Sequence, residues 1–245
     1  MNKTLKALEE AYYMAISLKI NREDRRDFQQ NFQKQLVREL NFHFIGEVEI
    51  YSHRFAAEKH GDFQKWDYLV LIPVHQVDQA DSMFAQLSKS ELLSRYETIR
   101  TEMLVTTPNS TYPVPGEKAQ KRKISPFYAV EYVDVHPPYL NEFRDIMITN
   151  NGPAMRYIME NVGWCHYFLA LETTKVYAHH SDYPTWNQIH VIGLYPDALV
   201  RYKKDFSKGL ALAKQITFDD NFERLKKIRT MLYKSLGGKV SDRDK

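Results

Sequence analysis

Four polar side chains lie inside segments that are otherwise apolar. His190 interrupts the apolar run 189–194, and Glu131 lies within the run 127–135. His166 and Glu172 occur on a third such segment at an even spacing, so both would point to one face of a strand. Burying such groups without partners is costly. We therefore expect them to line a cavity, to reach solvent or to bond to one another.

The chemistry that these residues could perform is proton transfer. The predicted catalytic residues are His190, Glu131 and Glu172: a carboxylate would orient the imidazole, and His190 would act as a general base. The residues predicted to bind an aromatic or acidic substrate are Tyr128, Tyr132, His166 and Tyr167. The alternative interpretation is a hydrogen-bonded core histidine with a surface glutamate.

A second candidate is a motif that occurs twice. Residues 60–67 and 180–187 share His, Asp and Trp at the same positions, 120 residues apart, and the chain has only three tryptophans. The pairing indicates an internal repeat. The His and Asp of each copy could form a polar or metal site, but a turn-capping Asp beside a packed Trp explains both copies equally well. The duplication favours this structural role, and His190 has only Val70 at the matching position of the first copy.

Other features exclude several classes of protein. A strand with Glu47, Glu49 and His53 on one face reads as a solvated or edge strand. No phosphate-binding glycine loop, paired cysteines or metal-binding helix motif occurs, and we predict no metal site. The single cysteine, Cys165, reads as an inert buried thiol in a reducing compartment.

The periodicity of apolar residues gives the same order of elements twice. In the first copy we expect strands at 12–20, 46–53, 68–74 and 103–107, a helix at 22–40 and a helical stripe from 83 to 99. In the second copy we expect strands at 127–136, 166–172, 188–194 and 215–218. Its helices would be one from 137 to 159, interrupted at 150–153, and one from 197 to 213. A last amphipathic helix is expected at 219–236.

These elements divide the chain into a first repeat (10–108), a proline-containing basic linker (109–126), a second repeat (127–218) and a C-terminal helix and tail (219–245). The order β-α-β-β-α-β predicts a ferredoxin-like sheet with helices on one face. The other face of each sheet is left bare, and two copies could stack to cover both. We therefore predict an α+β fold of tandem ferredoxin-like repeats that form an intrachain α/β barrel of antiparallel sheets covered by helices.

Over residues 10–218 this repeated order and paired hairpin motif resemble the dimeric α/β-barrel superfamily in a tandem, single-chain form. The resemblance implies a small-molecule pocket between sheet and helices or inside the barrel. Members include cofactor-independent monooxygenases, isomerases, haem-handling enzymes and proteins of unknown role, so the fold does not select the function. We expect proton abstraction from a hydrophobic or aromatic substrate without a cofactor. The alternatives are a non-catalytic binding or sensor protein and a haem-binding barrel protein.

Composition limits the partners. The net charge of +3 gives no case for nucleic acid, and no segment approaches the length of apolar residues needed to cross a membrane. We expect a cytoplasmic protein with a small-molecule ligand. Because one chain could complete its own barrel, either a monomer or a homodimer fits.

Overall fold

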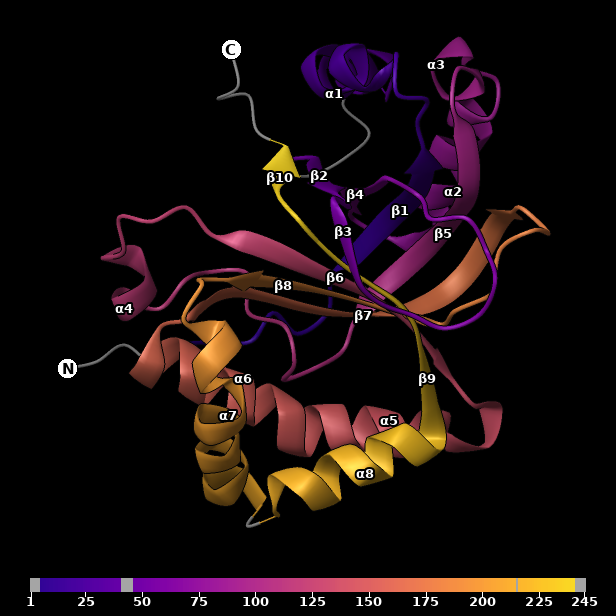
Figure 1. Cartoon of the computed structure of the whole chain (residues 1–245). Coiled ribbons are helices and arrows are strands. Elements are labelled where there is room, and N and C mark those ends of the chain that lie inside the picture. The colour runs from indigo at the N-terminus through magenta and orange to yellow at the C-terminus, as the bar shows by residue number, and fades with distance from the viewer. Residues whose placement is uncertain (1–4, 41–45, 215, 241–245) are drawn as a thin grey trace.

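The computed structural model describes residues 5–40, 46–214 and 216–240, and its strands form one ten-stranded antiparallel sheet (Figure 1). The first half contains β1 (Tyr12–Lys19), α1 (Arg25–Leu40), β2 (Glu49–Ser52), β3 (Phe55–Lys59), β4 (Tyr68–Val74), α2 (Val77–Leu87), α3 (Glu91–Ser94) and β5 (Glu97–Thr106). The second half contains β6 (Phe127–Val135), α5 (Leu140–Ile146), α6 (Gly152–Tyr157), β7 (Cys165–His179), β8 (Gln188–Leu194), α7 (Ala198–Lys214), α8 (Phe218–Ile228), β9 (Arg229–Gly237) and β10 (Lys239–Val240).

The strands of the two halves follow one rule of order. The sheet runs β10-β2-β4-β1-β5-β7-β8-β6-β9-β3. In the first half β1 lies between β4 and β5, and in the second half β6 lies between β8 and β9. When β2 and β3 are counted as one broken strand, the first strand of each half lies between the third and the fourth. This is the strand arrangement of a ferredoxin-like unit, and the halves meet where β5 pairs with β7.

The sheet has two ends, so the predicted barrel is not closed. The reason is that both segments at the ends are broken: residues 53–54 separate β2 from β3, and Gly238 separates β9 from β10. The two segments nevertheless stay together, because Ser52 N donates to Gly238 O (2.8 Å) and Arg54 N donates to Leu236 O (3.0 Å). A Cβ on Gly237 would lie 1.6 Å from Ser52 O, so this approach requires glycine.

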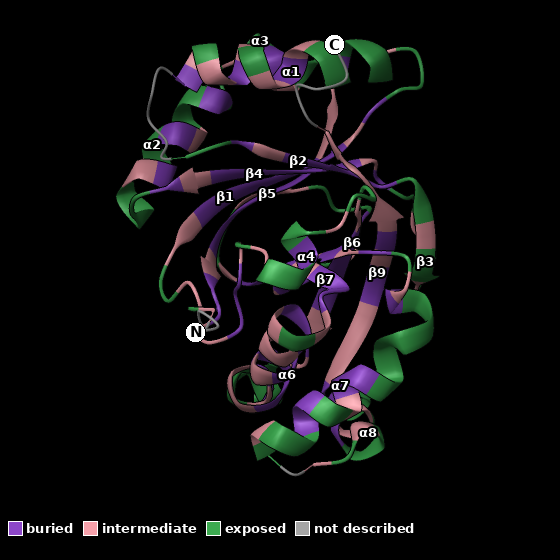
Figure 2. Cartoon of the chain, turned by 90° about the vertical axis from the view of Figure 1, so that its left-hand side faces the viewer, coloured by how far each residue is buried: buried purple, intermediate pink, exposed green. Residues whose placement is uncertain are grey.

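The sheet bends into layers with helices outside. Helices α1 and α2 cover the first half, and α5 to α8 cover the second (Figure 1). One apolar cluster lies between each half of the sheet and its helices. Another joins the inward faces of both halves, with Ala15 and Leu71 from one and Val130 and Leu169 from the other. Figure 2 shows buried residues along the strands and exposed residues on the outer sides of the helices.

The twice-occurring motif lies at the centre of this inner layer. Trp66 stacks on Trp186, with ring centroids 5.2 Å apart and planes inclined by 19°. The following residues repeat their contacts: Asp67 N donates to Leu18 O (2.8 Å), and Asn187 N donates to Val133 O (3.0 Å). The carboxylate of Asp67 and the amide oxygen of Asn187 accept from the backbone at the end of β1 and of β6, respectively.

Four predicted elements need correction, and the first is the helical stripe at 83–99, because its last residues, 97–99, belong to strand β5. Residues 229–236 form strand β9, not the end of a helix, because pairing with β6 and β3 outweighs a spacing that also fits a helix. The strand predicted at 215–218 is absent from the described residues 216–218: Thr217 caps α8, and residue 215 lies outside the described residues. The interruption at 150–153 is a widened π turn (Met147–Asn151) in a continuing helix, with Pro153 in the first turn of α6, where its missing N–H is tolerated.

The predicted linker contains its own structure. Helix α4 spans Glu117–Gln120, and Tyr112 is buried and forms a β-bridge with Phe168. Among the residues with described positions, no helix is long and apolar enough to cross a membrane.

Candidate functional site

Three charged or polar side chains form a row across neighbouring strands of the second half. Glu131 on β6 lies directly opposite His190 on β8 and Lys234 on β9. His190 Nδ1 is 3.2 Å from Glu131 Oε2, and Lys234 Nζ is 2.7 Å from Glu131 Oε1. His190 and Glu131 are only 2% and 7% exposed. The row thus holds a carboxylate between two nitrogen groups, away from water.

The surrounding charges keep Glu131 ionised. Burial by itself raises the pKa of this carboxyl, but Lys234, the hydrogen bond with His190 and the charge of Arg229 together hold the pKa well below its usual range. Because an ionised carboxylate only accepts hydrogen bonds, Nδ1 of His190 must carry the shared hydrogen. Neutral His190 therefore has its lone pair on Nε2.

That second nitrogen has no hydrogen-bond partner within the described part of the chain. Nε2 of His190 is buried as well, and leaving such an atom unpaired costs about 1–3 kcal/mol. Phe143 on α5 lies parallel to the imidazole, with ring centroids 6.2 Å apart, and the guanidinium of Arg229 lies 5.7 Å from the same Phe143 ring. An unpaired buried nitrogen of this kind calls for an explanation, and a ligand is one.

The helix over this row is irregular. Between α5 and α6, and again after α6 at Ile158–Val162, it widens into π turns, which often occur at functional sites. The first π turn is fixed by a buried amide chain: Asn150 Nδ2 donates to Asn221 Oδ1, and Asn221 Nδ2 donates to Asn151 Oδ1, both at 2.9 Å. These amide hydrogen bonds link the first π turn to α8.

The third predicted catalytic residue, Glu172, does not join the pair. On β7 the residue opposite His190 is Ala170, and Glu172 lies two residues further, opposite Gln188. Glu172 instead accepts from Thr107 Oγ1 (2.8 Å) and lies 3.5 Å from Arg144 Nε. The structure therefore brings together Glu131 and His190 and places Glu172 with other partners.

The predicted substrate-binding tyrosines lie on the other face of the sheet. Tyr128, Tyr132 and Tyr167 belong to the inner apolar cluster, whereas Glu131 and His190 face the helices. Odd spacing from Glu131 places Tyr128 and Tyr132 on the opposite face of β6, so the sheet separates them from His190. Tyr167 donates to Glu49 Oε2 at 2.5 Å. These tyrosines cannot position a molecule on His190.

His166 is also apart from the row. Its ring lies 5.5 Å from those of Tyr128 and Tyr195, at a break in the pairing of β7 with β8. A Cβ on Gly193 would come within 2.4 Å of His166 Nε2, so the ring fits only beside glycine. Burial lowers the pKa of His166 to about 4, and the ring is neutral at pH 7.

Sequence reasoning missed Lys234, which is half-buried, and one buried ion pair. Lys234 was assigned to a helix, which concealed its position opposite Glu131. Arg100 and Glu102 form a 3.0 Å ion pair, and the Trp186 indole donates to Glu102 Oε1 at 2.7 Å. That pair was overlooked because the predicted strand began at 103, although two opposite charges at an even spacing next to apolar residues were a visible signal.

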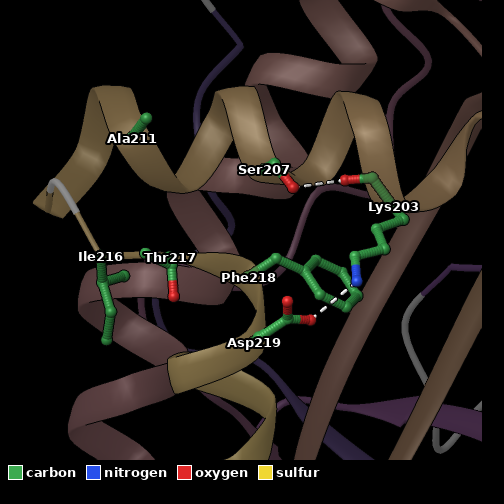
Figure 3. A pocket seen from close by; sticks show the side chains of 7 residues that line it. All are labelled: Lys203, Ser207, Ala211, Ile216, Thr217, Phe218 and Asp219. Atoms are coloured by element: carbon green, nitrogen blue, oxygen red, sulfur yellow. Dashed lines mark hydrogen bonds and ion pairs between the residues drawn. The ribbon is translucent and has the colours of Figure 1, made fainter.

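A groove of about 500 Å³ lies between α7 and the start of α8, away from the row (Figure 3). Its polar groups already have partners: Lys203 Nζ lies 2.8 Å from Asp219 Oδ1, and Ser207 Oγ donates to Lys203 O at 2.6 Å. These contacts are local and leave the groove no reactive group.

The remaining polar candidates form no metal centre. His60, Asp62, His180 and Asp182 are exposed. No group of three or more His, Cys, Asp or Glu side chains that could hold a metal ion exists within residues 5–40, 46–214 and 216–240. Cys165 is buried, and burial raises the pKa of its thiol to about 12, so it is not a ready nucleophile.

Comparison with known proteins gives a likeness of fold. No family model and no curated protein matches the chain. Among solved structures, a tryptophan-to-phenylalanine variant of chlorite dismutase from Candidatus Nitrospira defluvii in complex with cyanide has a TM-score of 0.52 at 12% identity, covering 96% of this chain and 92% of that one. The same enzyme in complex with imidazole has a TM-score of 0.51 at 10% identity, with coverages of 96% and 92%.

Chlorite dismutase-like proteins belong to the dimeric α/β-barrel, ferredoxin-like superfamily. The resemblance inferred from the order of elements is therefore supported at the level of the fold. At this identity the likeness concerns the fold alone.

Proposed function

We propose that this chain binds a small hydrophobic or aromatic molecule between the second half of the sheet and α5–α8, and that Nε2 of His190 is the reactive atom. One observation carries the proposal: His190 gives one ring nitrogen to Glu131 and leaves the other buried without a partner among the described residues. The nearby apolar cluster, with Phe143, Met147 and Phe206, suits a hydrophobic ligand.

The proposed chemistry is abstraction of a proton. The C–H bond of a bound molecule breaks, its proton passes to Nε2, and the electron pair stays on the substrate as a carbanion or enolate. Glu131 stabilises the imidazolium so formed, and Lys234 keeps Glu131 ionised throughout. This step begins an isomerisation, and it also begins an oxygenation in which dioxygen is the co-substrate. Phe143, stacked on His190, is the side chain whose place the ligand ring would take.

Deuterium incorporation tests this step directly. Aromatic compounds that raise the melting temperature are incubated with the protein in D₂O, and exchange at their acidic C–H positions is followed by NMR. We expect exchange with the wild type and a loss of about 10²–10⁴-fold in His190→Ala. His180→Ala, at an exposed histidine, is the matched control and should exchange normally. Unchanged exchange in a folded His190→Ala protein would refute the role of His190.

The same screen separates the binding or sensor alternative. A compound that raises the melting temperature of the wild type, raises that of Phe143→Ala at least as much because the ring's place is then empty, and never exchanges deuterium would indicate binding without turnover.

Haem binding through His190 is the second candidate, because a carboxylate on one nitrogen and a free second nitrogen is the usual arrangement of a metal-bound histidine. The donor set fits a haem ligand: His190 would hold the iron, and Glu131 would orient the imidazole. The described cavities around Lys203 and around His53 do not include His190, so haem would have to displace part of the apolar cluster. Bound haem would supply iron-centred redox chemistry. A Soret band on haem addition that is absent in His190→Ala would support this candidate, and no band in the wild type would eliminate it.

We also propose that the two halves are tandem copies of one unit. The shared strand order, the facing tryptophans and the repeated hydrogen bonds after them support the proposal.

A further inference from the structure

A cavity of about 700 Å³ is lined mainly by the first half, and His190 is not among its lining residues. Its walls come from the end of β1 and the start of α1, from the break between β2 and β3, and from the start of β4. Tyr233 of β9 closes one side. A cavity of this size suits a small organic ligand.

The charge of this cavity is strongly positive. Five cations line it, Lys19, Arg22, Arg25, Arg54 and Lys65, against one carboxylate, Asp67. Arg25 pairs with Asp67 at 2.6 Å, and Lys19 pairs with Glu97 at 2.9 Å. Arg22, Arg54 and Lys65 have no carboxylate partner in the part of the chain that the structure describes.

The fixed parts of the wall add to this field. The 16-residue helix α1 begins at the cavity, so its positive dipole end contributes to the same side. On the floor, His53 Nδ1 and Trp66 Nε1 are buried polar atoms without hydrogen-bond partners among the described residues, and these side chains are 9% and 1% exposed. Two unsatisfied polar atoms thus belong to residues of the same lining as the five cations.

The second half shows that the fold does not require these residues. By strand register Lys19 corresponds to Asp134, Arg54 to Thr174 and Lys65 to Thr185. His53 corresponds to Thr173, whose hydroxyl is already bonded to Glu102 at 2.7 Å. Lys19, Arg54, Lys65 and the buried imidazole of His53 therefore have no equivalent side chain at the matching positions of the second half.

We propose that this cavity binds a small multivalent anion that carries phosphate or carboxylate groups, held by Arg22, Arg54 and Lys65 at the rim. Arginine forms paired hydrogen bonds with phosphate groups and with carboxylate groups, so an anion carrying either group fits this rim. The site is separate from His190 and stands or falls independently of the function proposed there.

Isothermal titration calorimetry with pyrophosphate and with citrate tests the site in the full-length protein. We expect saturable one-to-one binding of at least one of them, and the stronger ligand identifies the preferred group. Arg22→Gln and Arg54→Gln should each weaken binding about two- to fivefold, because exposed ion pairs contribute about 0.2–1 kcal/mol. Higher salt should weaken it further.

Two controls make the outcome decisive. Arg26→Gln removes an exposed arginine of α1 that does not line the cavity, and His190→Ala alters only the other site; both should bind as the wild type does. Absence of binding by both anions, or equal weakening by Arg26→Gln and Arg54→Gln, would overturn the proposal. Melting temperatures of each variant establish that it is folded.

Discussion

The two halves of the sheet carry side chains of different chemistry at three matching positions on the face that packs against the helices. In the first half, Ile16 on β1 lies opposite Val70 on β4 and Thr101 on β5; in the second, Glu131 on β6 lies opposite His190 on β8 and Lys234 on β9. Both sets are largely buried, although Lys234 reaches solvent with 34% of its side chain. The same strand pairing thus accepts an apolar pair or an ion-paired histidine.

This difference teaches that the polar row is not needed to build the sheet. A buried ion pair seldom stabilises a fold more than well-packed apolar residues do, whereas removing one partner is strongly destabilising. The first half shows which apolar residues the chain itself uses at these positions. The row in the second half therefore agrees with the role proposed for His190.

The largest expected effect follows from removing Lys234, the cation that pairs directly with Glu131. Lys234→Met should lower the free energy of unfolding at pH 7 by about 3 kcal/mol, below the upper values for buried pairs because Lys234 is partly exposed. The low folded-state pKa of Glu131 stabilises the protein above about pH 4.3, and this stability is lost as pH falls. In Lys234→Met the folded-state pKa of Glu131 should rise toward its unfolded value, so less stability should be lost as pH falls below about 4.3.

Urea unfolding at pH 7 and at about pH 3 measures both effects. Lys204→Met, at an exposed lysine of α7, is the matched control and should change little. A Lys234→Met protein as stable as this control would mean that the row is not electrostatically coupled.

A second effect contrasts His53 with its counterpart Thr173. Burial lowers the pKa of His53 to about 3, so the unfolded chain takes up a proton below about pH 6.5 that the folded protein resists. His53 should therefore reduce stability as pH falls from about 6.5 to 3, by up to about 1.4 kcal/mol per pH unit. His53→Thr should flatten the stability profile by about 2 kcal/mol between pH 6 and 4. An unchanged slope would show that His53 is protonated in the fold.

The smallest effect on stability is expected from copying the first half into the second. The triple variant Glu131→Ile, His190→Val and Lys234→Thr should unfold within about 1 kcal/mol of the wild type, because it replaces the whole row. It should lose deuterium exchange and any haem binding. Calorimetry and the exchange assay check the two parts separately. A strongly destabilised triple variant would mean that the row supports the fold after all.

Much of the fold was predictable from local patterns. The short apolar runs at 68–74, 127–135 and 188–194 are strands, and the helix expected at 22–40 is α1. Residues 229–236 misled because Leu225, Ile228, Leu232 and Leu236 keep a helical spacing, while their partners on β6 and β3 lie far away in sequence. The closed barrel was overpredicted because no pattern reveals where a strand breaks.

The candidate site was predictable only in part. A charged residue inside each of two apolar strands identified Glu131 and His190, because burial demands a partner. Their distance to Glu172 depends on register across β7 and β8, which sequence does not specify. The tyrosines could have been excluded from residue spacing alone, since Tyr132 adjoins Glu131 and must face the other way.

The pairing of β3 with β9 and of β2 with β10 has a consequence for synthesis on the ribosome. A nascent chain that has completed β5 still has an exposed edge at β2 and β3, whose partners emerge only with residues 229–240. Folding of the sheet cannot finish before residues 229–240 have left the exit tunnel, so the growing polypeptide carries an unpaired strand edge from β3 until those residues emerge. This protein should depend on chaperones during translation more than a chain whose halves each close on themselves.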